Sequence, residues 1–160
     1  MKALLKVFLE AFLEKERKNC IFCSIIEGKQ PAYIIEENEH FLIILDIFPL
    51  RPGHTLIVAK RHVKFIEDLT YQEREVLIDL INKMSKKLKR SKLNAKATQI
   101  ILNNGKEANQ TIPHLHFHVI PRYGFDFPLL LFHFLTRFFN PYFRLGRRAR
   151  LSKVLEKIKA

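Results

Sequence analysis

The stretch "HLHFHVIP", residues 114–121, alternates histidine with apolar residues and constrains the fold more than any other part of the chain. Alternation with period two indicates a β-strand, because successive side chains of a strand point to opposite faces. A strand over residues 112–120, ended by Pro121, would carry three histidines on one face, about 6.6 Å apart. These are His114, His116 and His118. The intervening apolar side chains would pack in the core: Leu115, Phe117 and Val119.

A row of imidazoles on a rigid strand is suited to chemistry. Histidine titrates near neutral pH, binds metals, and acts as a nucleophile, an acid or a base. The chain holds only seven histidines, so three within five residues are not a chance cluster. A site made of metal ligands alone is a weaker interpretation, because collinear rings on one strand converge poorly on one ion. Solvated histidines without a function are a third interpretation.

The composition indicates a single globular domain. With 160 residues, 48% of them hydrophobic, the chain is long enough to bury a core. No apolar run reaches membrane-spanning length, and the charged N-terminus does not resemble a signal peptide. We therefore expect a soluble cytoplasmic protein. The net charge of +12 favours an anionic partner, such as a nucleotide, a nucleic acid or an acidic lipid surface.

The hydrophobic patterns predict an α+β fold. Apolar residues at helical spacing predict a long helix over residues 66–90, and a short helix is expected to end at Gly28. Besides the histidine strand, strands are expected at residues 32–37, 41–47, 55–59 and 97–103, the first two joined by the turn "NEH". We therefore expect an antiparallel five-stranded sheet that one long helix covers on one side.

Two segments flank this domain. We assign residues 1–18 to an amphipathic N-terminal helix, residues 19–123 to the domain and residues 124–160 to an aromatic and basic, helical C-terminal extension. The extension holds eight Lys/Arg and two Asp/Glu, a net charge of +6. Three interpretations of it stay open. It packs across a dimer and against the N-terminal helix, lies on an anionic membrane surface, or contacts nucleic acid. The last would use Arg147, Arg148, Arg150 and Lys153.

The two cysteines, Cys20 and Cys23, are separated by two residues in "CIFC". Such a pair is a poor structural staple and is better suited to bind a metal or to form a redox pair. A structural zinc site needs four ligands, so histidines would have to complete it. The alternatives are two buried thiols without a metal, or a redox pair, for which the usual βαβ context is missing.

These motifs together resemble the histidine triad (HIT) family, in its Hint-type branch. The resemblance rests on "HLHFHVI", "LDIFPLRPGHTLIVAKRH", the loop "LNNGKEANQTIPH" and the opening "CIFCSIIEGKQPAYIIEENEH", and it covers residues 19–123. Members are small α+β nucleotide-binding proteins, usually homodimers, that include hydrolases and transferases of nucleoside phosphates. The resemblance thus implies a HIT-like fold, a homodimer and a purine nucleotide substrate.

The resemblance also implies a catalytic role for each histidine of the motif. His116 would attack the α-phosphate and form a nucleotidyl-histidine, with an Nδ1–H bond to a carbonyl that leaves Nε2 available. His118 and His54 would flank the phosphate and stabilise its developing charge. His114 completes the catalytic set as the first histidine of the triad.

The implied nucleotide-binding residues are Phe22, Asp46, Ile47, His54, Asn103, Gln110, Thr111, His116 and His118. Gln110 and Thr111 would hydrogen-bond the phosphate or the leaving group, and Asp46 would accept from the ribose hydroxyls. Phe22 and Ile47 would line the base pocket, and Asn103 would approach the ribose and phosphate. Simpler interpretations remain open: Asp46 ends a strand, Phe22 and Ile47 belong to the core, and Asn103 is a turn residue. The family often has Gly at position 109, and Asn109 is the best replacement at positive φ.

Zinc-bearing members of the family imply that His62 and His114 complete a site with Cys20 and Cys23. Two thiolates and two neutral imidazoles balance the charge of Zn²⁺, and a closed four-ligand site is structural. Such a site would hold the N-terminal segment to the catalytic strand. No catalytic cofactor is expected.

The leading hypothesis is a HIT-family nucleotide hydrolase. It would release a nucleoside monophosphate from nucleoside phosphoramidates or dinucleoside polyphosphates. One alternative is nucleotidyl transfer to a phosphorylated acceptor instead of water. Another is a nucleotide-binding or scaffolding protein whose turnover is incidental, and a nucleic-acid-binding protein rests on charge alone.

Overall fold

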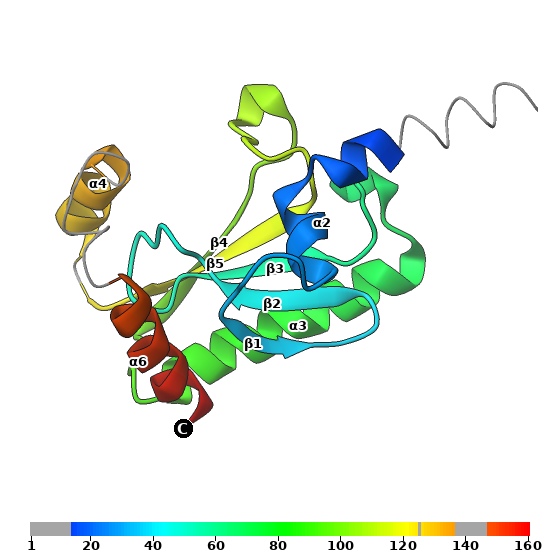
Figure 1. Cartoon of the computed structure of the whole chain (residues 1–160). Coiled ribbons are helices and arrows are strands. Elements are labelled where there is room, and N and C mark those ends of the chain that lie inside the picture. Colours follow the sequence, from blue (N-terminus) through cyan, green and yellow to red (C-terminus); the bar gives the residue numbers. More distant parts are fainter. Residues whose placement is uncertain (1–13, 125, 137–146) are drawn as a thin grey trace, which may run out of the picture.

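The computed structural model describes residues 14–124, 126–136 and 147–160 (Figure 1). Five strands form one sheet in the order β1-β2-β3-β5-β4, and every neighbouring pair is antiparallel. The strands are β1 (Ile34–Glu37), β2 (Phe41–Leu45), β3 (Thr55–Ala59), β4 (Ala97–Leu102) and β5 (His116–Arg122). The helices are α2 (Ile21–Ile26), α3 (Tyr71–Arg90), α4 (Phe127–Thr136) and α6 (Arg147–Lys159). The predicted α+β class and the antiparallel five-stranded sheet are confirmed.

Helix α3 begins later than the expected residue 66 because Thr70 caps it. The Thr70 side chain accepts a hydrogen bond from the backbone N–H of Glu73 at 3.2 Å, and Glu73 accepts from the Thr70 N–H at 2.7 Å. This reciprocal pair satisfies two backbone donors at the first turn of the helix. The preceding residues, Ile66–Asp68, form a separate 3₁₀ turn.

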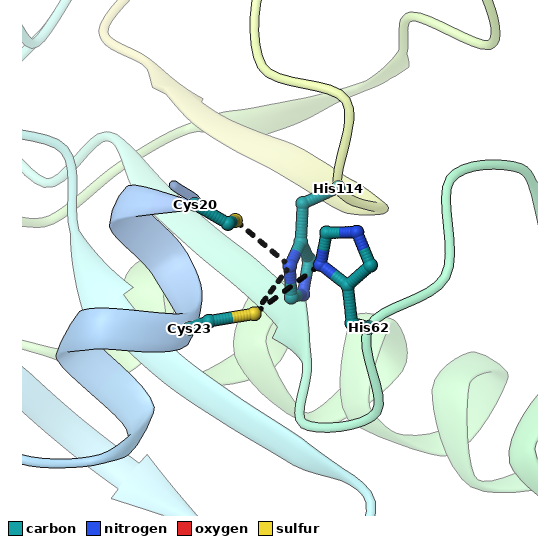
Figure 2. Close-up of side chains that lie close together, drawn as sticks. All are labelled: Cys20, Cys23, His62 and His114. Atoms are coloured by element: carbon teal, nitrogen blue, oxygen red, sulfur yellow. Dashed lines mark hydrogen bonds between the residues drawn. The ribbon is translucent and has the colours of Figure 1, made fainter. Parts of the chain in front are cut away.

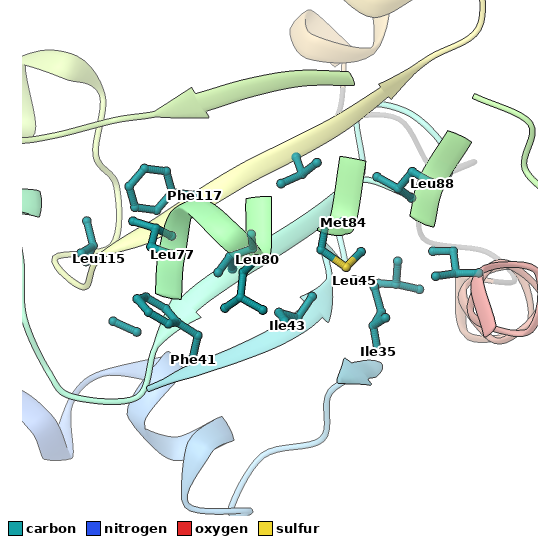
Figure 3. Close-up of a cluster of buried hydrophobic side chains, with 14 of the residues drawn as sticks. Ile35, Phe41, Ile43, Leu45, Leu77, Leu80, Met84, Leu88, Leu115 and Phe117 are labelled. Carbon is teal, nitrogen blue, oxygen red and sulfur yellow. The ribbon is translucent and has the colours of Figure 1, made fainter. Parts of the chain in front are cut away.

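The main core lies between α3 and one face of the sheet (Figure 3). Alternate residues of the central strands point toward α3, as period-two strands require. They include Phe41, Ile43, Leu45, Ile57, Phe117 and Val119, and they meet Leu77, Leu80, Met84 and Leu88 of the helix. The inward packing predicted for Leu115, Phe117 and Val119 is confirmed.

The opposite face of the sheet also has a cover, although we expected a cover on one side only. Short α2 packs Phe22 and Cys23 against Leu42, Ile44 and Val58 of β2 and β3. His116 pairs with Val58 and His118 with Leu56, so both histidines belong to the face that α2 partly covers. A long helix thus covers one face of the sheet and a short one covers part of the other, where His116 is buried and His118 is half-buried.

Strand β5 differs from the expected strand at both ends. It begins at His116, so His114 precedes the strand instead of sharing its face. The backbone of Leu115 donates to Val63 and accepts from Ala59, which draws this segment toward the residues after β3. At the other end, Pro121 lies inside the strand and pairs with Thr98. The pairing of β5 with β3 stops at Val119, so the missing N–H of Pro121 falls where β5 has one strand neighbour.

The C-terminal helix α6 packs on the domain. Leu151 and Ile158 are buried in the main core, and the Lys92 N–H donates to the carbonyl of Lys157 at 3.2 Å. Figure 1 shows α6 beside β1 and the end of α3, at the other end of the sheet from residues 14–18. Helix α6 therefore packs on the core of its own domain, away from residues 14–18, and packing across a dimer stays a prediction. Arg148 and Lys153 are exposed, whereas Arg150 is half-buried.

The remaining expectations for the ends fall partly outside the described residues. Residues 14–18 are helical, in agreement with the end of the predicted N-terminal helix, and residues 1–13 lie outside the description. Most aromatic residues of the extension also fall outside it. In α4, Phe127 and Phe132 are more than half exposed. Among the described helices, none is both long and apolar enough to cross a membrane.

Candidate active site and metal site

His116 is oriented by a bond to the backbone two residues before it. Its Nδ1 lies 2.7 Å from the carbonyl oxygen of His114. Since a carbonyl can only accept, Nδ1 carries the proton of the neutral ring and Nε2 carries the lone pair. Burial lowers the pKa of His116, against the opposing effects of the His114 bond and the charge of Asp46. The ring is therefore neutral at pH 7, in the tautomer that a nucleophilic Nε2 needs.

His54 and His118 form a hydrogen-bonded pair beside His116. Nε2 of His54 is 2.9 Å from Nδ1 of His118, and the ring centroids of His116 and His118 are 5.0 Å apart. The N–H of Leu50 donates to Nδ1 of His54 at 3.2 Å, so the proton of neutral His54 is on Nε2. His54 then donates to His118, which carries its own proton on Nε2. A third contact, 3.4 Å between Asp46 Oδ2 and Nδ1 of His54, is longer and becomes an ion pair only if the ring is protonated.

A tight turn places His54 against the sheet. Gly53 has φ +87°, a conformation that side chains disfavour, and a Cβ there would lie 2.6 Å from Cδ1 of Leu93. The His54 N–H donates to the carbonyl of Arg51, and the His54 carbonyl accepts from Asp46. The glycine and these two bonds place a fully buried imidazole at the start of β3.

Phe22 and Asp46 lie with the histidines, whereas Ile47 is more exposed. The Phe22 ring is buried, and its centroid lies 4.9 Å from the centroid of the His116 ring. Asp46 accepts from the Phe48 N–H at 2.8 Å and is close to His54. Ile47 is 44% exposed, so the interpretation of this side chain as plain core is wrong. For Phe22, packing against the sheet is present, and the base-pocket role stays a prediction.

The loop after β4 uses its amide side chains to hold its own shape. Gln110 accepts from the Gly105 N–H at 2.8 Å and donates to the Lys64 carbonyl at 2.9 Å. Asn103 donates to the carbonyl of Asn109, which has φ 62°, the positive value expected of a glycine replacement. Thr111 is exposed. The predicted nucleotide contacts of Asn103, Gln110 and Thr111 remain predictions.

Four predicted metal ligands come together from three parts of the chain (Figure 2). The Sγ of Cys20 is 3.3 Å from Nδ1 of His114, and the Sγ of Cys23 is 3.2 Å from Nδ1 of His62 and 3.6 Å from Nδ1 of His114. Tetrahedral zinc, with Zn–S of about 2.3 Å and Zn–N of about 2.0 Å, separates S and N ligands by about 3.5 Å. The observed spacing therefore fits one zinc ion between the four side chains.

The protonation of the four side chains also fits a cation. Burial lowers the pKa of His114 to about 4 and also lowers that of His62, so both rings are neutral. Nε2 of His114 donates to the Ala59 carbonyl at 2.6 Å, which leaves Nδ1 as the ligand atom. Burial, with the neighbouring Cys20, raises the pKa of the Cys23 thiol to about 12. A thiolate at this position therefore needs a bound cation, and Zn²⁺ would supply the charge.

Comparison with known proteins decides the family. Residues 27–125 match the HIT domain. The chain belongs to the HIT family. An uncharacterised HIT-like protein of Methanocaldococcus jannaschii is 43% identical over 107 residues, 67% of this chain and 81% of that protein. The adenosine 5'-monophosphoramidase hnt1 of Schizosaccharomyces pombe is 33% identical over 104 residues, 65% of this chain and 74% of that enzyme.

Solved structures agree with this assignment. A zinc-bound histidine triad family protein of Mycobacterium smegmatis has a TM-score of 0.66 at 33% identity, over 86% of this chain and 96% of that one. A hypothetical histidine triad nucleotide-binding protein of Sulfolobus tokodaii has a TM-score of 0.63 at 28% identity, over 88% of this chain and 94% of that one. The predicted family is confirmed.

Sequence reasoning missed the groups that support these histidines. The Leu50 N–H and the Ala59 carbonyl are backbone atoms, which leave no signal in residue types. Glu16 and Lys64, which pair at 2.7 Å next to the metal ligands, were also missed. For Glu16 a signal existed, since the predicted N-terminal helix places it one turn before Cys20.

Proposed function

We propose that this HIT protein hydrolyses nucleoside phosphoramidates or dinucleoside polyphosphates at the α-phosphate and releases a nucleoside monophosphate. The observation that carries the proposal is the bond between Nδ1 of His116 and the His114 carbonyl, because it directs the lone pair to Nε2. A buried, neutral imidazole in this tautomer is a competent nucleophile at pH 7.

The proposed reaction has two displacements at phosphorus. Nε2 of His116 attacks the α-phosphorus, a P–N bond forms, and the bond to the leaving group breaks with its electron pair. A leaving amine takes up a proton from solvent. Water then attacks the same phosphorus and gives up a proton, the P–N bond breaks, and Nε2 recovers its lone pair. The monophosphate leaves, and the enzyme is unchanged.

The other histidines would stabilise the charge that develops on the phosphoryl oxygens. His54 and His118 are joined at 2.9 Å, and the tautomers assigned above give His118 an Nε2–H that can donate to a phosphate oxygen. Fixed donors in a water-poor site lower the barrier because they need no reorganisation. Phe22 and Ile47 would contact the base, Asp46 the ribose, and Asn103, Gln110 and Thr111 the phosphate side.

Zinc would have a structural role in this proposal. Cys20, Cys23, His62 and His114 would hold it in a closed site, and no displacement step uses it. The zinc-bound relative from Mycobacterium smegmatis and the ligand spacing support this assignment. When bound, the ion supplies the charge that keeps two thiolates buried and fastens the N-terminal segment to the residues before β5.

Adenosine phosphoramidate is the first substrate to test, because the relative from Schizosaccharomyces pombe bears the name of an adenosine 5'-monophosphoramidase. Diadenosine tetraphosphate is the second. Wild type and His116→Ala would be mixed with each substrate, quenched at non-acidic pH because the P–N bond is acid-labile, and measured by intact-protein mass spectrometry. His40→Ala is the control, since His40 lies in the turn between β1 and β2.

The expected result is a mass increase of one AMP in wild type and His40→Ala that is absent in His116→Ala, together with AMP release. An adduct that turns over only with a phosphorylated acceptor would mean a transferase. Neither adduct nor AMP from either substrate would overturn the proposal and favour a binding protein. The homodimer and the cytoplasmic location stay predictions, and light scattering of the purified chain tests the first.

A further inference from the structure

Two buried polar atoms beside the candidate metal site lack a hydrogen-bond partner. They are Nε2 of His62 and Oε2 of Glu16. Such atoms are uncommon in folded proteins, because burial without a partner costs free energy. Both residues line the same cavity, which has a volume of about 460 Å³ and also contacts Asn19, Cys20 and Thr111. The two residues that carry these unpaired atoms therefore line one cavity.

Glu16 is held at this position by its other oxygen. Oε1 accepts from Nζ of Lys64 at 2.7 Å, and Lys64 follows His62 by two residues. The ion pair thus joins the helical residues 14–18 to the segment that carries His62. Burial dominates the environment of the His62 ring and lowers its pKa, while the negative charge of Glu16 acts in the opposite direction. The carboxylate is accordingly within electrostatic range of the ring.

The two histidine ligands differ in what supports them. Each presents Nδ1 to the cysteines, so each carries a proton on Nε2 when Nδ1 binds a metal. His114 donates that proton to the Ala59 carbonyl at 2.6 Å. Nε2 of His62 has no such acceptor among the described residues and is the unpaired atom.

We propose that Glu16 accepts a hydrogen bond from Nε2–H of His62, directly or through one water, and so acts as a positioning residue of the zinc site. A carboxylate on the far nitrogen fixes the ring and makes the other nitrogen a stronger ligand. The cavity is roomy enough for one bridging water, and His62 and Glu16 would give that water two polar partners. This inference rests on the proposed zinc site and is independent of nucleotide hydrolysis.

The inference gives the N-terminal segment a function. Glu16 lies outside the residues that match the HIT domain, 27–125, as do both cysteines. The metal site would then draw on residues 14–23 for two ligands and for the acceptor that orients a third. Loss of such an acceptor typically weakens metal binding 10- to 100-fold.

The test is zinc affinity, measured on the full chain by competition with a chromogenic chelator. Glu16→Ala is expected to weaken zinc binding at least about 10-fold, and Glu16→Gln, which keeps an acceptor oxygen, to restore part of the loss. Glu14→Ala is the matched control, because Glu14 lies on the same helical segment and pairs with exposed Lys18. It should bind zinc as wild type does. Equal affinities of Glu16→Ala and wild type would overturn the inference.

A second arm separates ligand orientation from docking of the N-terminal segment. A cysteine ligand has no ring N–H to donate to Glu16. In a His62→Cys background, Glu16→Ala should therefore change zinc affinity less than about twofold. The same loss in both backgrounds would mean docking alone and would overturn the inference.

Nuclear magnetic resonance tests the same bond with all four metal ligands left in place. In the zinc-loaded wild type, the Nε2 proton of His62 should exchange slowly with water and give a signal. Glu16→Ala should lose the signal, and Glu14→Ala should keep it. A signal that persists in Glu16→Ala would contradict the proposed bond. If wild type binds no zinc, the zinc site itself is wrong, and nucleotide hydrolysis can still be judged from the adduct on His116.

Discussion

Nδ1 of His116 lies 2.7 Å from the carbonyl oxygen of His114, whose own ring faces the sulfurs of Cys20 and Cys23. One residue therefore serves both sites, since its side chain would hold the metal and its backbone orients the nucleophile. Any displacement of His114 reaches His116 through a single hydrogen bond. The candidate metal site and the candidate active site are thus mechanically coupled.

Removal of zinc should lower both stability and activity. With free zinc at 1,000 times its Kd, binding stabilises the folded chain by about 4 kcal/mol, so a chelator should remove about that much. AMP release should also fall, because the His114 carbonyl loses its fixed position. Urea unfolding and AMP release would be measured with chelator and after zinc is restored. Unchanged unfolding in the chelated protein, confirmed as zinc-free by mass spectrometry, would contradict a structural role.

Substitution of either supporting histidine should slow the reaction without preventing the adduct. His54→Gln and His118→Gln each remove a donor that acts on the phosphate or on its partner, and loss of one such donor costs about 10²- to 10³-fold in kcat. The fold loss in kcat of the double variant should be smaller than the product of the two single losses, because the rings act through one 2.9 Å hydrogen bond. Single-turnover rates measure both effects. Multiplicative losses would show that the two rings act independently.

Glu73 should make stability depend on acid pH. The hydrogen bond from the Arg61 guanidinium lowers the pKa of Glu73 to about 2, below the usual 4.5. A carboxyl with a depressed folded-state pKa stabilises fully above its unfolded pKa, and this contribution disappears as pH falls from about 4.5 to about 2. Glu73→Gln should therefore cost about 1–2 kcal/mol at pH 7, since Arg61 is half exposed and the cap is also weakened.

The difference between wild type and Glu73→Gln should shrink as the pH is lowered toward 2. Urea unfolding at a series of pH values measures it, and the subtraction removes the titration of the metal ligands, which both proteins share. Glu75→Gln on the exposed side of the same helix is the control and should change stability by less than about 0.5 kcal/mol. A pH-independent difference would assign the loss to helix capping alone.

Ile158 tests whether the C-terminal helix belongs to the folded domain. Its side chain is 2% exposed in the main core, so Ile158→Ala should cost about 2–4 kcal/mol. Lys157→Ala, one residue earlier on the exposed side, should cost less than about 0.5 kcal/mol. Denaturant unfolding compares the two. Equal stabilities of Ile158→Ala and Lys157→Ala would mean that α6 leaves the core in solution. That result would favour a membrane or nucleic-acid partner for the extension.

The sequence predicted most of the sheet because its local patterns agree with the tertiary contacts. Apolar alternation placed Phe117 and Val119 in the core. The turn sequence "NNG" at residues 103–105 and the positive φ of Asn109 are both compatible with the loop after β4. The expected start of β5 was wrong because nonlocal bonds override the local pattern: the bonds of Leu115 to Val63 and Ala59 draw the segment before β5 away from the sheet. The expected start of α3 was wrong for a local reason, because Thr70 and Glu73 cap the helix later than its apolar pattern predicts.

The amino-acid sequence alone shows which side chains are available for chemistry: three alternating histidines, a Cys-x-x-Cys pair and His54 after a glycine. Period and residue type are local properties, so they can be read directly from the sequence. How these groups are used depends on the tertiary fold. It brought His54 to His118 across 64 residues, turned His114 toward the cysteines and set Glu16 beside His62. Hydrogen-bond direction and burial depend on backbone atoms and neighbours far away in the chain, and no residue-type pattern encodes them.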